Sequence, residues 1–157
     1  MESMRIILIC GFFFSLAVSA CPNGWVTHNG NCYHFSHDVE DWTGAYTMCK
    51  ILGGQLLELE DTTESNFISS QVNISGKTYW IGLSDVNEEG TWVWMTSMTK
   101  LSVTNWSPGE PTATNGNHDI ENCVVIYNKN GMWNDAACAH MNFYICEKSD
   151  ESSEIVG

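Results

Sequence analysis

The sequence predicts an α+β domain whose helices are segregated from a mostly antiparallel sheet. Its apolar patterns follow the order hairpin, helix, strand, helix and then a run of short strands. The chain of 157 residues is long enough for one ordinary domain. It contains no internal repeat, no heptad pattern and no linker that would separate two domains. We therefore expect a single domain built around one sheet.

The first 20 residues are typical of a secretory signal peptide. Residues 6–19 are almost wholly apolar, and the small residues at 18–20 suit cleavage after Ala20. The alternative is a membrane anchor, but this run is shorter than the roughly 20 residues that span a bilayer. We expect a secreted, extracellular protein without membrane insertion, with its domain at residues 21–148. Residues 149–157 are polar and acidic, which predicts a disordered tail.

The first elements of the domain are predicted to be a hairpin and a helix. Asn29-Gly30 lies between two short aromatic runs, and this pair supports the positive φ angles of a tight turn. Apolar residues at i, i+3, i+4 spacing predict a helix over residues 38–52. Asp38 is its expected N-cap, and Gly53-Gly54 is expected to end it.

A second helix and several strands follow. Residues 61–72 predict a helix that Thr62 or Thr63 caps. Apolar runs rich in β-branched and aromatic residues predict strands at 56–59, 78–83, 91–95, 123–127, 132–134 and 142–147. The tryptophans of these runs, Trp80 above all, are expected in the core because large aromatic side chains dominate buried area.

Six of the seven cysteines follow the predicted signal peptide, and an even number in a secreted chain implies three disulfides. Counting alone leaves about fifteen connectivities. Sequence spacing favours two local bridges, Cys21–Cys32 and Cys123–Cys138, which leaves Cys49–Cys146 to close nearly the whole domain. A zinc site is the alternative, but the chain has no C-x-x-C pair.

The formal net charge of −13 at pH 7 excludes some partners and favours others. Such a surface repels phosphate and attracts cations, so nucleic acid and anionic lipid are poor partners. The chain also lacks a G-x-S-x-G motif and a Gly-rich phosphate loop, and we expect no enzyme. The alternative is a glycosidase acting through Glu110 and Glu121, but these carboxylates lie in an oxygen-rich array that suits a metal.

That oxygen-rich array runs from Trp106 to Asp135. It contains the carboxylates of Glu110, Glu121 and Asp135, with amide and hydroxyl side chains beside them at the ends of predicted strands. Calcium takes about six to eight oxygen ligands, chiefly from carboxylates and carbonyls. The stretch therefore predicts a Ca²⁺ site.

Residues 21–146 resemble the C-type lectin domain. The matching features are the six cysteines in order, W-I-G-L at 80–83, E-P-T at 110–112, E-N-C at 121–123 and W-N-D at 133–135. The disulfide pairing of that family agrees with the three bridges given above. The resemblance implies the C-type lectin fold, with two helices, a mostly antiparallel sheet, a long-loop region and chain ends that lie close together.

In the sugar-binding members of this family, a Ca²⁺ ion holds two neighbouring hydroxyl groups of one sugar. The resemblance implies five ligands for this ion, Glu110, Thr112, Glu121, Asn134 and Asp135. All but Asp135 would also contact the carbohydrate, with His118 as a further contact. Each shared side chain gives one oxygen to the metal and keeps a hydrogen-bonding partner for the sugar. Pro111 follows a cis peptide bond in the family, and proline lowers the cost of that bond.

Thr112 departs from the family pattern, which has Asn or Asp at this position. Asn offers a carbonyl to Ca²⁺ and an N–H to the sugar, whereas Thr has one hydroxyl for both tasks. Because Glu110 matches the mannose-type order of the loop, we expect mannose-type or related glycans, with galactose-type specificity as the alternative. The loop is longer than in simple members, so four of its residues are further candidate contacts, Asn115, Asn117, His118 and Asp119.

A second calcium site of the family, which braces the long loop, would use Asp85, Glu89 and Asn122 here. Ala113 stands where the family has an acid, and Asn122 is neutral, so two of the usual oxygens are missing or uncharged. A solvated acidic loop without metal is the alternative.

Two N-glycosylation sequons are present, at Asn73 and at Asn105. Asn73 is expected in a polar loop and is the favoured acceptor. Asn105 lies beside the predicted metal loop, and the Trp in the middle of its sequon makes it a poorer acceptor.

The sequence thus predicts a single-domain secreted lectin, similar to those of invertebrates, that binds microbial surface glycans in innate immunity through Ca²⁺. One shallow site binds weakly, so multivalency through a homodimer or small oligomer is expected. Two alternatives stay open. The charge of −13 suits a perlucin-like matrix protein of biomineralisation, and loss of the metal would leave a protein-binding module.

Overall fold

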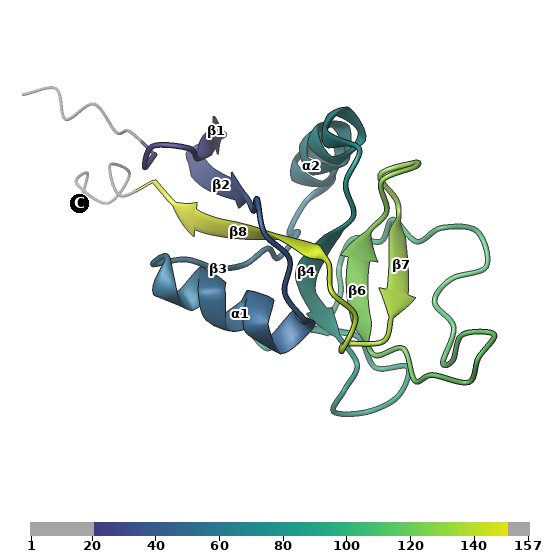
Figure 1. Cartoon of the computed structure of the whole chain (residues 1–157). Helices are drawn as coiled ribbons and strands as arrows, with labels where there is room; N and C mark the ends of the chain where they lie inside the picture. Colours follow the sequence, from purple (N-terminus) through teal and green to yellow (C-terminus); the bar gives the residue numbers. More distant parts are fainter. Residues whose placement is uncertain (1–20, 151–157) are drawn as a thin grey trace, which may run out of the picture.

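The computed structural model describes residues 21–150 (Figure 1). The predicted signal peptide at 1–20, and the predicted tail from residue 151 onward, lie outside the described residues. Within residues 21–150, no helix has both the length and the apolar character needed to cross a bilayer.

The described residues form an eight-stranded sheet with a helix on either side of β8 in Figure 1. The strand order is β1-β2-β8-β4-β6-β7, while β3 pairs with β8 and β5 pairs with β4. Among these strand pairs β4 and β8 run parallel and the others antiparallel. This arrangement confirms the α+β fold. The elements in chain order are β1 (Val26–His28), β2 (Asn31–Phe35), α1 (Trp42–Ile51), β3 (Gln55–Leu56), α2 (Thr62–Ser75), β4 (Tyr79–Ser84), β5 (Val93–Trp94), β6 (Cys123–Ile126), β7 (Trp133–Ala136) and β8 (Phe143–Ser149).

The Asn29-Gly30 turn is confirmed, since both residues have positive φ angles, of 48° and 80°. The start of α1 is not where the sequence predicted it. Asp41 is the N-cap and its carboxylate accepts from the Gly44 N–H over 2.7 Å, so the prediction of Asp38 is wrong. The reason is tertiary, because Glu40 is held extended by an isolated bridge to Asn142.

The second helix also has an aspartate cap. Asp61 accepts from the Glu64 N–H over 2.8 Å, so the cap is neither Thr62 nor Thr63. The helix runs to Ser75 and ends at the left-handed Gly76. Asn73 is therefore an exposed residue of the last helical turn and not part of a loop.

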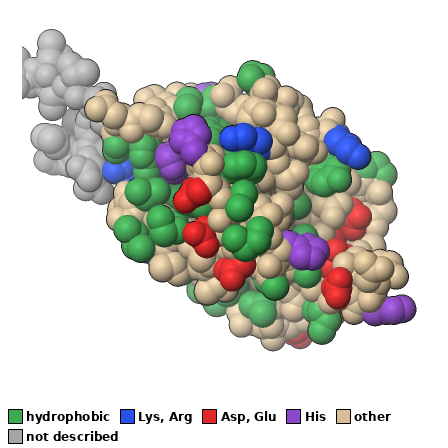
Figure 2. Space-filling view, viewed as in Figure 1, with side chains coloured by type: hydrophobic (Ala, Val, Ile, Leu, Met, Phe, Trp, Pro, Cys, Tyr) green, Lys and Arg blue, Asp and Glu red, His purple; other side chains and the backbone are tan. Residues whose placement is uncertain are grey.

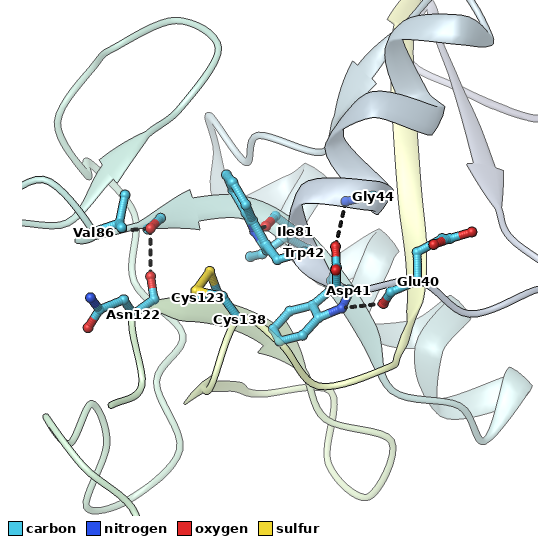
Figure 3. The surroundings of a disulfide bond; sticks show 11 residues. Glu40, Asp41, Trp42, Gly44, Ile81, Val86, Asn122, Cys123 and Cys138 are labelled. Atoms are coloured by element: carbon cyan, nitrogen blue, oxygen red, sulfur yellow. Dashed lines mark hydrogen bonds between the residues drawn. A yellow bond between two sulfur atoms is a disulfide. The ribbon is translucent and has the colours of Figure 1, made fainter. Parts of the chain in front are cut away.

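Two tryptophan N–H groups connect α1 to the sheet, as Figure 3 shows in part. The Trp42 indole donates to the Ile81 carbonyl over 2.9 Å, and the Trp80 indole donates to the Glu40 carbonyl over 3.0 Å. Trp80 is fully buried, as predicted. These bonds hold the start of α1 against the middle of β4. The residues of β4 that follow Ile81 therefore have a fixed position.

All three predicted disulfides are confirmed, namely Cys21–Cys32, Cys49–Cys146 and Cys123–Cys138. The last one joins the start of β6 to the segment after β7 (Figure 3). The two ends of the described chain lie close together, because the Cys21 sulfur and a carboxylate oxygen of Asp150 lie within 4.8 Å of each other, and the Asp150 N–H donates to the Gly30 carbonyl over 2.8 Å. Strand β8 includes Ser149, so ordered structure extends one residue into the predicted tail.

Candidate functional site

The loop before β6 turns on a cis peptide bond between Glu110 and Pro111, in agreement with the resemblance. Two backbone hydrogen bonds support this turn, from Glu110 to Ser107 over 2.9 Å and from Ser107 to Trp133 over 2.8 Å. A third comes from the Thr112 N–H, which donates to Asp135 Oδ2 over 2.7 Å. The loop is therefore fastened to β7 at two places.

Thr112 connects the two strands that carry the predicted ligands. Its hydroxyl donates to Glu121 Oε2 over 3.2 Å, while its backbone donates to Asp135. Glu121 lies two residues before the start of β6, and Asp135 lies on β7 opposite Val124 of β6. The structure thus brings Thr112, Glu121 and Asp135 into one hydrogen-bonded group.

Glu110 and Asn134 complete the predicted set of five. The Glu110 carboxyl adjoins that of Asp135 closely enough to raise its pKa. Asn134 lies next to Asp135 on β7, and its side-chain amide donates to the Asp135 carbonyl over 2.7 Å. An amide NH₂ has two donors, so one N–H of Asn134 is left for another partner.

The carboxyl groups of this site are held in an unfavourable environment. Asp135 is fully buried, and this burial, together with the Glu110 carboxyl, raises its pKa to about 7. Burial also raises the pKa of Glu121, against the opposing effect of the Thr112 hydroxyl bond. A positive charge at this point would stabilise both ionised forms.

Two carboxylate oxygens at this site are buried and accept no hydrogen bond from an N–H or O–H donor of the described residues. They are Asp135 Oδ1 and Glu110 Oε2. A buried polar atom without a partner is costly, so most such atoms in proteins are satisfied by a hydrogen bond, water or an ion. Carboxylate and carbonyl oxygens are the donor set that Ca²⁺ takes, so the residues present fit this ion.

Compact clusters of acidic, histidine and cysteine side chains are rare in residues 21–150. The group whose ligand atoms all lie within 4.8 Å of one another is Cys21, Cys32 and Asp150, and its two cysteines form a disulfide. The carboxylate oxygens of Glu110, Glu121 and Asp135 do not all lie within 4.8 Å of one another. Ligands on opposite sides of one Ca²⁺ ion lie about 5 Å apart, so the wider spacing is compatible with calcium.

Of the residues predicted for a second calcium site, the structure brings two together. Asp85 is almost fully buried and donates its N–H to the Asn122 carbonyl over 3.3 Å. Asp85 Oδ2 accepts from the Gly90 N–H over 2.8 Å, whereas Asp85 Oδ1 and Asn122 Oδ1 are buried without a partner. Glu89 lies on the exposed turn after Asp85. Each of these two residues, which the Asp85–Asn122 backbone bond brings together, therefore has one buried oxygen available to a cation.

One residue near the site carries no sequence signal. His140 lies in the loop between β7 and β8, and its imidazole opposes the rise in the Glu121 pKa that burial causes. No motif includes this position, so only the fold reveals it. Figure 2 shows histidine and carboxylate side chains together at the end of the molecule that carries the long loops.

The two sequons differ in what their asparagines do. Asn73 is exposed on α2. The side-chain N–H₂ of Asn105, which would carry the glycan, donates to the Gly131 carbonyl over 3.1 Å and to the Ser69 hydroxyl over 3.4 Å.

Comparison with known proteins agrees with this fold. The family model described as "Lectin C-type domain" matches residues 38–148. Human CD209 antigen is 38% identical over 134 residues, which cover 84% of this chain and 32% of that protein. The chain therefore spans about a third of the length of this curated relative.

Two solved structures are also similar. The carbohydrate-recognition domain of cow CD23, solved in the presence of a GlcNAc2Man3 oligosaccharide, has a TM-score of 0.74 and 31% identity, covering 83% of this chain and 97% of that one. A Ca²⁺-dependent type II antifreeze protein has a TM-score of 0.71 and 27% identity, covering 82% and 100%. The fold, the three disulfides and the family match lead to one conclusion: the chain belongs to the C-type lectin domain family, whose domain is a non-enzymatic binding module.

Proposed function

We propose that this protein is a secreted lectin that binds carbohydrate through Ca²⁺. The ion is held by five residues, Glu110, Thr112, Glu121, Asn134 and Asp135. The observation that carries the proposal is the pair of buried, unpartnered carboxylate oxygens, Asp135 Oδ1 and Glu110 Oε2. A cation would compensate these two buried carboxylates, which otherwise repel each other.

The bound ion supplies coordination positions for two neighbouring hydroxyl groups of one sugar. The side chains of this chain orient the sugar around those positions. Glu110 and Glu121 accept hydrogen bonds from the sugar hydroxyls, and the remaining N–H of Asn134 donates one. Asp135 makes no contact with the sugar in this proposal. It binds the metal with one oxygen and holds the loop in place with the other, which accepts from the Thr112 N–H.

The proposed ligands are mannose-type or related glycans on microbial surfaces, which gives the protein a role in innate immunity. The support is the Glu-Pro order of the loop and the similarity to a domain solved in the presence of a mannose-containing oligosaccharide. Cleavage after Ala20 and three disulfides suit a secreted, extracellular protein.

Two further features belong to the same proposal. Asp85, Glu89 and Asn122 hold a second Ca²⁺ that braces the loop, supported by the unpartnered oxygens of Asp85 and Asn122. A homodimer or small oligomer supplies the avidity that one weak site lacks. Light scattering coupled to size exclusion tests the oligomer, and a monomer alone would contradict it. The favoured glycan acceptor is the exposed Asn73.

A glycan array probed with Ca²⁺ and with EDTA tests the proposal. The expected result is binding to mannose-type glycans that EDTA abolishes and that the Glu121→Ala variant lacks. Adsorption to calcium carbonate without glycan binding would instead favour a matrix protein of biomineralisation. Absence of both glycan binding and Ca²⁺ stabilisation would leave a protein-binding module, and Glu121→Ala with undiminished sugar binding would overturn the mechanism.

A further inference from the structure

Asparagine followed directly by glycine is a chemically reactive pair. The backbone nitrogen of the glycine can attack the side-chain carbonyl carbon of the asparagine and close a succinimide ring, because glycine has no Cβ to obstruct the approach. The described residues contain four such pairs, at Asn23-Gly24, Asn29-Gly30, Asn115-Gly116 and Asn130-Gly131. They differ in whether their two reacting groups are held by hydrogen bonds.

The side chain of Asn115 is held in place by three hydrogen bonds. Its Oδ1 accepts from the N–H groups of Asn117 and Asp119 over 2.8 and 3.0 Å, and its Nδ2 donates to Asp119 Oδ2 over 2.9 Å. The side chain has to turn toward the nitrogen of Gly116 for the ring to close. Reaction at this pair therefore requires these bonds to break.

The pair at Asn130 is held on both reacting groups. Asn130 Oδ1 accepts from the Met132 N–H over 2.9 Å. The attacking nitrogen is engaged as well, because the Gly131 N–H donates to the Tyr127 carbonyl over 2.9 Å, and Gly131 is buried. Ring closure at this pair loses a bond on each side.

The other two pairs lie in the segment 21–32, which the Cys21–Cys32 disulfide closes. Asn23 and Asn29 are both exposed. Within residues 21–150, neither of these two side chains has a hydrogen-bond partner, and the N–H groups of Gly24 and Gly30 donate to none. All four reacting groups of this segment are therefore available.

The backbone around these two pairs is held by the residues that flank them. The Trp25 N–H donates to the Pro22 carbonyl over 3.0 Å across the first pair, and His28 is paired with Asn31 across the second. Ring closure in the segment 21–32 thus requires a local rotation of a turn, without the loss of a hydrogen bond on either reacting group.

We propose that Asn23 and Asn29 are sites of spontaneous deamidation, so that the segment 21–32 ages chemically before the other asparagine–glycine pairs do. The glycine nitrogen bonds to the asparagine Cγ and loses its proton, and the side-chain nitrogen leaves as ammonia. Water then adds to one of the two succinimide carbonyls and opens the ring, which gives aspartate or isoaspartate. The reaction uses no oxidant and no reductant, and the inference does not depend on calcium or sugar.

The position of the segment determines what the modification changes. Each product carries one more negative charge than asparagine, and isoaspartate also adds a methylene to the backbone. At position 29 the longer backbone enters a two-residue turn, so it disturbs the pairing of β1 with β2 and the bond from the Asp150 N–H to the Gly30 carbonyl. Figure 1 shows β1 and β2 at the end of the molecule opposite the long loops beside β6 and β7. Ageing therefore loosens one end of the domain and leaves the candidate site unchanged.

The test follows all four pairs in one sample. The disulfide-bonded protein is incubated in mildly alkaline buffer made with heavy-oxygen water, which labels newly formed carboxylates, and its peptides are measured by mass spectrometry. Asn23 and Asn29 should convert at least about tenfold faster than Asn115 and Asn130, because each hydrogen bond that must break slows the reaction by roughly fivefold.

Two controls connect the rates to the structure. In guanidinium and reductant the hydrogen bonds of all four pairs are lost, so the four rates should converge. Asp119→Ala removes the carboxylate that holds the Asn115 amide, so it should speed conversion of Asn115 by roughly fivefold and leave the rates of Asn23 and Asn29 unchanged.

Asn29→Gln provides the matched variant within the segment 21–32. It keeps the amide but lengthens the side chain by one methylene, so the five-membered ring cannot form, and labelling should vanish at position 29 while it continues at Asn23. Equal rates at the four pairs of the folded protein, or faster labelling at Asn115 or Asn130, would overturn the proposal. The absence of labelling at Asn23 or Asn29 would also overturn it. None of these results bears on the proposed function, because the measurement requires neither calcium nor sugar.

Discussion

The backbone N–H of Thr112 and the carboxylate of Asp135 are hydrogen-bonded over 2.7 Å. Oδ2 of Asp135 is used in this bond, and Oδ1 is buried without a partner. One carboxylate therefore has a structural oxygen that fastens the loop and a second oxygen free for a cation. Replacing Asp135 disturbs both roles, whereas replacing Glu121 leaves the Thr112–Asp135 bond in place.

Calcium is expected to stabilise the fold. At a Ca²⁺ concentration about 100 times the dissociation constant, the free energy of unfolding should rise by about 2.7 kcal/mol per site. Glu121→Gln should reduce this rise because it removes a charged ligand, while Glu60→Gln, at an exposed acid away from the site, should keep it. Thermal unfolding with Ca²⁺ and with EDTA measures the difference. An equal calcium effect in both variants would argue against Glu121 as a ligand.

Thr112→Asn should strengthen the site. The backbone N–H that bonds Asp135 is kept, and the new side chain offers a carbonyl to Ca²⁺ and an N–H to the sugar. We expect calcium and mannose-type affinities to rise by about tenfold, as one good hydrogen bond would give. Calorimetry measures both, with Thr114→Asn as the control. A weaker site in Thr112→Asn would mean that the Thr112–Glu121 contact matters more than the lost amide.

Asp85→Asn should remove one of two calcium ions per chain. The Gly90 N–H that donates to Asp85 Oδ2 can donate equally well to an amide oxygen, so the loop can keep its shape while the charge is lost. Equilibrium dialysis with radioactive calcium should then show about one ion instead of two, the number that follows from two proposed sites. A value of one ion in the unmodified protein would show that the Asp85 site does not bind.

Glu147, which lies outside both proposed calcium sites, should make the stability of the fold depend on pH. It is buried and close to the Glu64 and Glu58 carboxyls, and its pKa is raised to about 8 mainly by burial. Below the ordinary Glu pKa both states hold the proton. Between the ordinary Glu pKa and pH 8, the unfolded chain releases this proton while the folded protein keeps it, so the free energy of unfolding falls as pH rises.

Glu147→Gln removes this penalty. The variant should match the original at pH 4 and exceed it by on the order of 3 kcal/mol at pH 7, from a pKa difference of about 2.5 units up to that pH. Urea unfolding in EDTA at both pH values gives the comparison. A gain that is the same at pH 4 and pH 7 would assign the effect to packing rather than to charge.

Asn105 is expected to act as a structural residue. Its side chain joins the Gly131 carbonyl of the β6–β7 turn to Ser69 of α2, so Asn105→Ala should lower the free energy of unfolding by about 1 kcal/mol. Mass spectrometry of the protein from a eukaryotic host should find glycan on Asn73 and none on Asn105. Glycan on Asn105 would show that these contacts form late or not at all.

The sequence was sufficient for features that depend on local or covalent chemistry. The Asn29-Gly30 turn and the three disulfides could be predicted because each requires particular residues at particular positions, and the cis bond before Pro111 followed from the resemblance to the C-type lectin domain. The start of α1 could not be predicted, since the bridge from Glu40 to Asn142 joins residues that are distant in the chain.

Part of the candidate site could likewise be predicted from the sequence, and part of it depends on the fold. The five proposed ligands follow from motifs, but the burial of Asp135 and the partner of the Thr112 hydroxyl depend on how the loop returns to β7. The proximity of His140 to Glu121 likewise depends on the fold alone.

The Cys123–Cys138 bridge has a consequence for how this domain could be redesigned. It joins the start of β6, two residues after Glu121, to the segment after β7, the strand that carries Asp135, so the spacing of these two residues does not depend on the outer part of the loop between Thr112 and Glu121. The segment between Thr114 and Ile120 is then an exchangeable cassette, closed by its own bridge. Libraries of variants confined to residues 115–119 should yield proteins with new glycan specificities on an unchanged scaffold, because these positions lie outside the bridge that closes the segment.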